Sequence, residues 1–392
     1  AAEIPLIPPA ASIAERGRGF LTISKAPLDA KILFEWADQA YGGTQAEGKY
    51  SVKDAYDAME LGVNKMIERS FLTMTPALDA KGAHEAVAAL KTQIVSKLPT
   101  QSKRTTETDQ FQQFSTPPTI AYVANWVANI QKGETYLEPS AGIGGLAVFG
   151  KNAGANVFVN ELSSRRRKLL EQLEFGVARV FGETAEQINN ILPKDIKPTV
   201  VVMNPPFSAT AGRLQATSSL EGFKHVEQAL KRLEPNGRAV VILGKGITDT
   251  SAFKKWLTSL GKGYTLKSDI GISGKEYQKY GTTYGNQLLV IDKVPATEAK
   301  PITGDVEKVE DAIDLLKGVR DERITGEQKK SPEQKGEGIP QAGEGGYRPA
   351  SPVLPATGEV GPGTRGPGNR PPGVRQPFRP DVGTAGPVHE ET

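Results

Sequence analysis

Residues 136–146 read Tyr-Leu-Glu-Pro-Ser-Ala-Gly-Ile-Gly-Gly-Leu. The first residues have the short apolar pattern of a buried strand, and the glycines that follow allow a tight turn in which the backbone can approach a nucleotide closely. Glu161 lies 19 residues after Gly142, at the end of the next expected strand. A carboxylate there can accept hydrogen bonds from both hydroxyl groups of a ribose. The stretch therefore predicts a strand, a turn and a helix start that together bind an adenosine-containing cofactor.

Glu138 separates two classes of adenosine cofactor. The spacing Gly142-x-Gly144-x-x-Ala147 also fits the dinucleotide fingerprint. However, an acidic residue at the strand end just before the turn would repel an anionic pyrophosphate, whereas it could bind the ammonium group of a methionine. The carboxylate of Glu138 therefore favours S-adenosylmethionine over a dinucleotide.

The surrounding pattern predicts the fold class. Between residues 106 and 293, short β-rich runs alternate with helices, which is typical of an α/β protein whose parallel sheet has helices on both faces. The expected strands are Thr135–Glu138, Asn156–Asn160, Ala178–Phe181, Val200–Met203, Ala239–Leu243 and Gln287–Ile291.

The sequence Asn204-Pro205-Pro206-Phe207 follows the expected strand Val200–Met203, at the sheet edge where ligands bind. The two prolines stiffen the loop, so that the Asn204 side-chain oxygen and the Pro205 carbonyl can accept the two hydrogens of one planar amine. Phe207 would stack on the ring that carries this amine. The loop predicts methyl transfer to an exocyclic amine by positioning and electrostatics, without a metal ion.

Thr116 and Pro117 precede an amphipathic run that begins near Ile120. We expect Thr116 to cap this helix, with Pro117 in its first turn. The exposed backbone amides at such a helix start would attract a carboxylate.

These three elements, in this order, resemble the N6-adenine DNA methyltransferases of the gamma arrangement over residues 113–293. The resemblance implies a class I (Rossmann-like) methyltransferase sheet, S-adenosyl-L-methionine as cofactor and a flipped-out adenine of DNA as target. It implies catalytic roles for Asn204, Pro205, Pro206 and Phe207. The implied cofactor-binding residues are Thr116, Pro117, Glu138, Ser140, Ala141, Gly142, Gly144, Glu161, Thr184 and Ala185. Thr184 departs from the family, which usually has Asp there.

A narrower resemblance is to the methyltransferase part of phage antirestriction proteins and of methyltransferase-helicase proteins related to Strawberry notch. It is carried by Ser51–Tyr56 and by Ser273–Thr282. It implies a helicase module elsewhere in a longer polypeptide, because this chain contains no Walker motif. Tyr277 and Tyr280 have two interpretations of about equal weight: they stack against the target base, or they pack in the core.

Composition limits the class of protein. The chain has 392 residues, with 48 Lys and Arg against 45 Asp and Glu, which argues against bulk DNA coating but allows a local basic groove. The run Arg165–Lys168 contacts nucleic acid or is a solvated helix face. With no cysteine and only three histidines, we expect neither disulfides nor a metal site. No apolar run approaches the roughly 20 residues of a membrane helix, and no signal peptide is evident, so we expect a cytoplasmic protein of a bacterium or phage.

Five segments are expected along the chain. Residues 1–24 are an extended arm, 25–105 a helical N-terminal domain and 106–294 the methyltransferase domain. Residues 295–330 are a linker with one short helix. Residues 331–392 contain 12 Pro and 13 Gly, a composition typical of a disordered tail.

Three other functions remain open from the sequence. The same loop methylates bases in structured RNA or glutamine side chains in release factors, where Tyr is the usual fourth residue. A different alternative is a non-catalytic scaffold that keeps the fold and binds DNA or protein. Phe207 and the intact loop favour DNA methylation over these alternatives.

Overall fold

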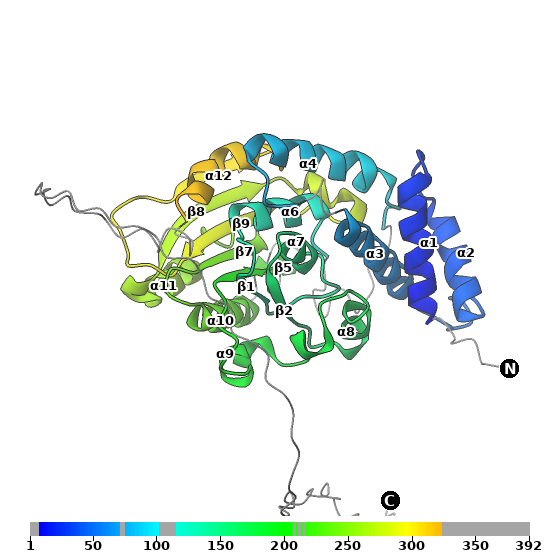
Figure 1. Ribbon diagram of the computed structural model, residues 1–392, viewed down its shortest axis with the longest axis horizontal. Coiled ribbons are helices and arrows are strands. Elements are labelled where there is room, and N and C mark those ends of the chain that lie inside the picture. The colour runs from blue at the N-terminus through cyan, green and yellow to red at the C-terminus, as the bar shows by residue number, and fades with distance from the viewer. Residues whose placement is uncertain are drawn as a thin grey trace, which may run out of the picture. The chain divides into compact units, whose positions relative to one another are not determined.

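A central sheet of eight strands organises the chain, as a computed structural model shows (Figure 1). The structure describes residues 8–70, 75–101, 115–206, 209–210, 213–214 and 216–323, and only the backbone of residues 177, 209–210, 213–214 and 216–221. The strands of the sheet are β1 (Thr135–Glu138), β2 (Asn156–Asn160), β3 (Val180–Phe181), β4 (Val200–Met203), β7 (Arg238–Gly244), β8 (Thr265–Ile272), β9 (Asn286–Asp292) and β10 (Ile302–Val306). A separate hairpin pairs β5 (Ala209–Thr210) with β6 (Arg213–Leu214).

The strand order is β10-β8-β9-β7-β4-β1-β2-β3. All paired neighbours are parallel except for β9, which runs antiparallel to both β7 and β8. The sheet is therefore mixed rather than fully parallel. From β1 the strand order runs through β2 and β3 to one edge of the sheet, and the chain then returns to place β4 on the other side of β1. This reversal of strand order opens a crevice at the carboxyl ends of β1 and β4.

Helices cover both faces of the sheet. Val200 and Val202 pack into one apolar cluster with α6 (Pro118–Val127), α4 (Ala80–Gln93) and α12 (Asp311–Asp321), while Val201 and Met203 pack into another with α10 (Ala216–Arg232) and α11 (Ser251–Ser259). Figure 1 shows the two layers above and below the sheet. Alternate residues of a strand point to opposite faces, so a wholly apolar strand requires cover on both. The expected fold class is confirmed.

Shorter helices connect the strands. They are α7 (Ala147–Asn152), α8 (Ser164–Leu170), α9 (Ile188–Ile191) and the 3₁₀ turns η1 (Val95–Lys97), η2 (Val177–Arg179), η3 (Ala185–Gln187), η4 (Gly261–Gly263) and η5 (Gly274–Tyr280). None of the helices in the described part of the chain is long and apolar enough to cross a membrane.

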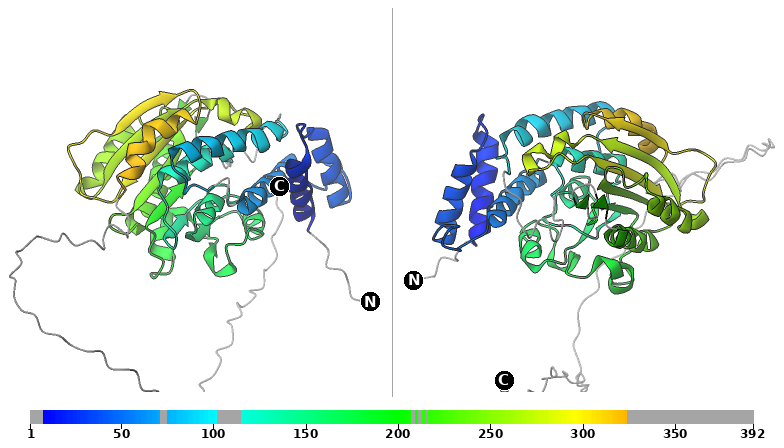
Figure 2. Two further views of the ribbon diagram at one scale, coloured as in Figure 1. Left: turned by 45° about the horizontal axis from the view of Figure 1, so that its top comes forward. Right: turned by 180° about the vertical axis from the view of Figure 1, so that it is seen from behind.

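The N-terminal helices are α1 (Pro9–Ile23), α2 (Ala30–Tyr41) and α3 (Val52–Arg69), and Figure 2 shows α1 between the other two. The expectation that residues 1–24 form an extended arm is therefore wrong for residues 9–23. Proline is tolerated in the first helical turn, where Pro9 lies, because its missing N–H would have no partner there. At the crossing of α1 and α3, a Cβ on Gly62 would lie 2.5 Å from the Ala14 carbonyl oxygen, so glycine permits the close approach.

The segment after β9 belongs to the sheet. Strand β10 pairs with β8, and Val309 in the turn that follows, together with Ile313 and Leu316 of α12, is buried in the core. Residues 295–323 are thus not a linker, and all the described residues belong to one compact unit without a division near 105 or 294. The expected tail, residues 331–392, lies outside the described residues.

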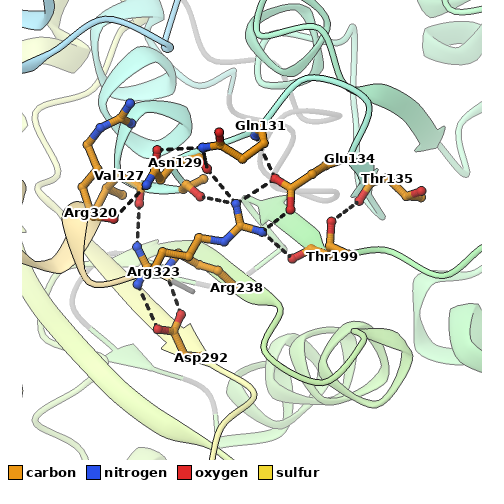
Figure 3. A network of polar contacts seen from close by, with 11 residues as sticks. Val127, Asn129, Gln131, Glu134, Thr135, Thr199, Arg238, Asp292, Arg320 and Arg323 are labelled. Atoms are coloured by element: carbon orange, nitrogen blue, oxygen red, sulfur yellow. Dashed lines mark hydrogen bonds and ion pairs between the residues drawn. The ribbon is translucent and has the colours of Figure 1, made fainter. Parts of the chain in front are cut away.

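A polar network closes the amino edge of the central strands (Figure 3). Arg238, at the start of β7, is 0% exposed and binds both carboxylate oxygens of Asp292, at 2.7 and 2.8 Å. It also donates to the carbonyls of Val127 and Val319, at 3.0 and 2.8 Å. These four residues lie on or beside β7, β9, α6 and α12, so one guanidinium joins the sheet to the layer of α6 and α12.

Two further arginines extend this network. Arg323 binds both oxygens of Glu134, at 2.7 and 2.8 Å, and donates to the Thr199 carbonyl at 3.2 Å. Arg320 donates to the Trp126 carbonyl and lies 5.0 Å from the centre of the Trp126 ring. Arg320 lies in the last turn of α12 and Arg323 follows that helix, and their partners lie at the starts of β1 and β4 and at the end of α6.

Candidate active site

The carboxyl ends of β1, β2 and β4 border a cavity of about 530 Å³. Ten of the residues singled out in the sequence line it: Thr116, Glu138, Ser140, Ala141, Gly142, Glu161, Thr184, Ala185, Asn204 and Pro206. The parallel strands end at the same edge of the sheet, which explains why motifs far apart in sequence meet there.

Six of the expected residues are not among those that line the cavity, and two of them are the tyrosines described below. Phe207 lies outside the described residues, and Pro205 does not line the cavity. Pro117 is buried, and Gly144 has a positive φ of 87° with Leu170 and Leu173 close to where a Cβ would stand. Gly144 therefore serves the packing of the turn and does not face the cavity.

The glycine turn holds Glu161 in a fixed orientation. The Gly142 backbone amide donates to Glu161 Oε2 at 2.8 Å, and the Ser163 amide donates to Oε1 at 2.9 Å. Gly142 has a φ of 58°, a conformation that glycine adopts without strain. Each carboxylate oxygen keeps a second lone pair, so Glu161 can still accept two hydroxyl hydrogens from a ligand in the cavity.

Glu138 presents an oxygen without a partner. The residue is 2% exposed, and its Oε2 has no hydrogen-bond partner among the described residues. Burial raises the pKa of Glu138 well above its usual value, and the nearby carboxylates of Glu161 and Glu60 raise it further, against the opposing effects of the Ala147 amide and the Arg166 charge. A buried carboxyl group at a cavity wall with an unused oxygen fits a cationic ligand.

Asn160 ties the strand ends together. Its side-chain amide donates to the carbonyls of Pro139 and Glu183, each at 2.9 Å, and its Oδ1 accepts from the Glu183 backbone amide at 2.8 Å. These contacts join the segments that follow β1, β2 and β3. They fix the position of Thr184 and Ala185, which begin η3 at the cavity wall.

Asn204 and Thr116 are joined by a hydrogen bond. Asn204 Nδ2 donates to Thr116 Oγ1 at 3.0 Å, so the amide oxygen Oδ1 is the remaining acceptor. The expectation that Thr116 caps the following helix is wrong, because α6 begins at Pro118 with Pro117 as its N-cap and without a side-chain cap. The Thr116 hydroxyl instead sets which way the Asn204 amide faces.

Helix α3 supplies part of the cavity wall. Glu60 lines the cavity and accepts a hydrogen bond from Ser115 Oγ, and Asn64 Nδ2 donates to the Ile143 carbonyl at 2.8 Å. Sequence reasoning missed this contribution. The available signal was a polar stripe of Lys53, Asp57, Glu60 and Asn64 at helical spacing, beside apolar residues of the same helix.

Other cavity residues were also missed. They are Asn160, Leu162, Ser163, Arg166, Glu183, Glu186 and His225. Most of them lie within a few residues of the predicted motifs. Including the residues on either side of each strand end would have found them.

The basic run of α8 is engaged within the protein. Arg165 pairs with Asp54 and Asp57 of α3, at 2.9 and 2.7 Å. Arg167 donates to the Glu161 carbonyl at 2.9 Å, and Arg166 is 7% exposed. Only Lys168 of the run is exposed. The run is therefore not a fully solvated helix face, and its contact with nucleic acid stays a prediction.

The two tyrosines do not line the cavity. Tyr277 is 4% exposed within the apolar core, and its hydroxyl accepts a hydrogen bond from Asn286 Nδ2. Tyr280 packs against the same core, with its ring centre 6.3 Å from that of Tyr277. The burial of Tyr277 favours core packing over base stacking for that residue. The stacking role of Tyr280, which is only partly buried, stays a prediction.

Within the described ranges, no cluster of three or more His, Asp or Glu side chains is arranged to hold a metal ion. The polar side chains that line the cavity are carboxylates, amides and hydroxyl groups, together with the guanidinium of Arg166 and the imidazole of His225.

No family model and no curated protein sequence matches the chain. Among solved structures, it is similar to a candidate class I S-adenosylmethionine-dependent methyltransferase from Listeria monocytogenes, with 13% identity, a TM-score of 0.45 and coverage of 80% of this chain and 98% of that one. It is also similar to a modification subunit of a candidate type I restriction enzyme from Vibrio vulnificus, with 18% identity, a TM-score of 0.41 and coverage of 64% and 60%.

A third similar structure is a candidate methyltransferase from Streptococcus mutans in complex with SAH, with 14% identity, a TM-score of 0.33 and coverage of 46% of this chain and 99% of that one. At these identities and TM-scores, the similarities do not bear on the substrate or the functional residues of this chain.

Proposed function

We propose that the chain binds S-adenosylmethionine in the cavity. A volume of about 530 Å³ suits a ligand of this size. The unused Glu138 oxygen fits the cofactor's ammonium group, and Glu161 can accept from the ribose hydroxyls. Thr184 and Ala185 would border its adenine.

We further propose that the methyl group is transferred to the exocyclic N6 amine of adenine in DNA. The hydrogen bond from Asn204 to Thr116 is the observation that carries this proposal. Since the NH₂ side of the Asn204 amide is held by Thr116, its oxygen is the group that can accept from a target amine. The Pro205 carbonyl would accept the second hydrogen of the same amine.

This arrangement suits a poor nucleophile. When bound, S-adenosylmethionine supplies an electrophilic methyl carbon on a positively charged sulfur. The side-chain oxygen of Asn204 and the backbone carbonyl of Pro205 would each accept a hydrogen bond from the amine. Together they would hold its nitrogen in line with that carbon. As the new N–C bond forms and the S–C bond breaks, the surplus proton of the amine passes to water. Phe207 is proposed to stack on the flipped base.

The cellular setting follows only from the resemblance in sequence. We propose a cytoplasmic enzyme of a phage or mobile element that modifies DNA against restriction, with a helicase module in the full-length polypeptide.

The test is methyl transfer from labelled S-adenosylmethionine to DNA, RNA or a release factor, followed by mass spectrometry of nucleosides and peptides. We expect N6-methyladenine in DNA. Asn204→Ala should lower the single-turnover rate by about 10²–10³-fold, as for the loss of one preorganised polar partner, and should leave cofactor affinity nearly unchanged. Asn190→Ala is the matched control, because Asn190 is exposed and bonds only to Gln187 in the described structure.

Each other outcome contradicts part of the proposal. Label in RNA or in glutamine would replace the DNA substrate. Transfer by Asn204→Ala at the parent's rate would remove the assigned role of the amide. An absence of transfer to any of the three substrates would favour the scaffold alternative.

A further inference from the structure

The motif Ser51–Tyr56, at the start of α3, does not line the cavity but contacts α8, the helix that follows Glu161. Ser51 and Asp54 form a capping box: Ser51 Oγ accepts from the Asp54 amide at 3.1 Å, and Asp54 Oδ2 accepts from the Ser51 amide at 2.8 Å. The other oxygen, Oδ1, accepts from Arg165 Nη1 at 2.9 Å. One carboxylate therefore joins the first turns of α3 and α8.

Asp57, one turn further along α3, makes a second tie. Its Oδ2 lies 2.7 Å from Arg165 Nη2, and both of its oxygens accept from Lys53 Nζ, at 2.9 and 3.1 Å. The Asp57 residue is 4% exposed. Burial raises the pKa of this carboxyl group, but the charges of Lys53, Arg166 and Arg165 hold it below its usual value. Asp57 is therefore ionised at neutral pH, and Arg165 bridges two carboxylates of one helix.

The start of α8 determines where the Glu161 carboxylate lies. Ser163 is the N-cap of α8, and its backbone amide donates to Glu161 Oε1 at 2.9 Å. Arg167 of α8 donates to the Glu161 carbonyl at 2.9 Å. The far end of α8 is held by the buried Leu170, whereas Arg165 ties the first turn to α3. A shift of that first turn would therefore move the carboxylate.

Helix α3 holds both segments that orient Glu161. The second oxygen of Glu161, Oε2, accepts from the Gly142 amide in the glycine turn at 2.8 Å. Asn64 of α3 donates to the Ile143 carbonyl in this turn at 2.8 Å, while the aspartates of the same helix hold α8 through Arg165. The two amides that bind Glu161 are thus both positioned by α3.

We infer that Arg165 is a positioning residue of the cofactor site: its ion pairs with Asp54 and Asp57 hold the first turn of α8 so that Glu161 meets the ribose hydroxyls. The inference rests on the proposed function, because it requires a ribose-bearing ligand beside Glu161. Arg165 does not line the cavity and acts through the carboxylate alone. The helical motif at the start of α3 thereby takes part in ribose recognition.

A double-mutant cycle tests this coupling. The affinity for S-adenosylhomocysteine is measured by calorimetry in the parent, in Arg165→Gln, in Glu161→Ala and in the double variant. Arg165→Gln should weaken binding by roughly 5- to 20-fold in the parent, and by no more than about twofold once Glu161 is removed, as for two residues that act through one contact.

A second ligand gives a measurement that does not require Glu161→Ala to fold. The 2′,3′-dideoxy analogue of S-adenosylhomocysteine lacks both ribose hydroxyls, so Glu161 has no hydroxyl to bind. Arg165→Gln should leave its affinity within about twofold of the parent value, because changes at residues that share no contact with a ligand are close to additive. A general loss of folded protein would instead weaken both ligands alike.

The controls address charge and folding. Arg165→Gln leaves Asp57 bonded to Lys53, so the buried carboxylate keeps a counter-charge. Lys65→Gln removes a positive charge from the same helix at a pair with Glu15 of α1, 3.0 Å apart, and should leave both affinities unchanged. Arg165→Lys keeps a charge for the aspartates and should recover part of the lost affinity for S-adenosylhomocysteine.

The outcomes distinguish this inference from the proposed function. If the parent does not bind S-adenosylhomocysteine, the proposed cofactor is wrong and the inference falls with it. If the parent binds but Glu161→Ala binds equally well, the ribose contact is wrong and Arg165 has nothing to position. If Glu161→Ala weakens binding while Arg165→Gln does not, or weakens both ligands by the same factor, only the role of Arg165 is wrong.

Discussion

The two edges of the sheet treat buried charge in opposite ways. At the amino edge, Arg238 makes two bonds to Asp292 and two to backbone carbonyls, so its hydrogen-bonding capacity is largely used (Figure 3). At the carboxyl edge, Glu138 Oε2 and Arg166 Nε have no hydrogen-bond partner among the described residues. The first edge contains charges that stabilise the fold, and the second contains charges that await a ligand.

This difference separates stability from function. A satisfied buried pair holds the fold, whereas an unsatisfied buried charge lowers the stability of the ligand-free protein and is compensated when a ligand binds. Substitutions at the two edges should therefore move stability and binding in different directions.

The largest effect is expected at the amino edge. Asp292→Asn leaves Arg238 buried without a counter-charge and should lower the free energy of unfolding by about 3–5 kcal/mol. Urea denaturation measures this change, and the affinity of the folded fraction for S-adenosylhomocysteine should stay the same. Asp305→Asn is the control, because its pair with Lys245 is exposed and contributes about 0–1 kcal/mol. Equal effects of the two substitutions would contradict the structural role of the network.

The second-largest effect is expected at Glu138, where the substitution should stabilise the ligand-free protein instead of destabilising it. Glu138→Gln keeps an acceptor for the Ala147 amide but removes the buried charge, so the ligand-free protein should become more stable by about 1 kcal/mol. Affinity for S-adenosylhomocysteine should fall by an amount equivalent to about 2–5 kcal/mol. Thermal unfolding and calorimetry on one preparation measure both quantities. A variant that is less stable and binds normally would place Glu138 with the structural charges.

The smallest effect is a dependence on pH. Burial raises the pKa of Glu138 in the ligand-free protein above 4.5, and it raises the pKa of Glu60 in the same way. The charges of Arg166 and Lys53 and the Ala147 amide oppose these shifts. An ammonium ligand requires the ionised carboxylate. Affinity for S-adenosylhomocysteine should therefore fall as the pH drops through the raised pKa, by up to about 1.4 kcal/mol for each pH unit.

The stability of the ligand-free protein should change in the other direction. Because folding favours the protonated form of Glu138, its contribution is greatest below the unfolded-state pKa and is lost as the pH rises toward the folded-state value. Calorimetry and thermal unfolding at a series of pH values check both signs. If Glu138→Gln keeps the parent's pH profile of binding, another group is responsible.

The parts of the fold that the sequence predicted were those with a local signal. Val200–Met203 is a wholly apolar run and forms a strand covered on both faces, as expected. Two strands were missed for identifiable reasons. Thr265–Ile272 contains Lys267 and Asp269 and shifts register between Leu266 and Ser268, which breaks the alternation of its side chains. Ile302–Val306 is an edge strand with mostly exposed residues, so it lacks an apolar pattern.

The candidate site divides in the same way. Residues next to a strand end, such as Glu138, Glu161 and Asn204, could be placed from spacing alone. Glu60 could not, because it reaches the cavity only through the packing of α3 against the glycine turn, 55 residues before its partner Ser115. The partner of the Thr116 hydroxyl was missed for a similar reason: Asn204 lies 88 residues further along the chain.

The Arg238 network also has a consequence for the order of folding during synthesis. Arg238 is translated 54 residues before Asp292 and 81 residues before the Val319 carbonyl. A nascent chain that ended between Gly244 and Asn286 would have every strand from β1 to β7 but an uncompensated guanidinium in its interior, and it would lack the antiparallel strand β9. The antiparallel part of the sheet and its helix layer therefore cannot be completed until α12 has been synthesised. This delay would leave the apolar surface of β7 accessible to chaperones or to misassembly during translation.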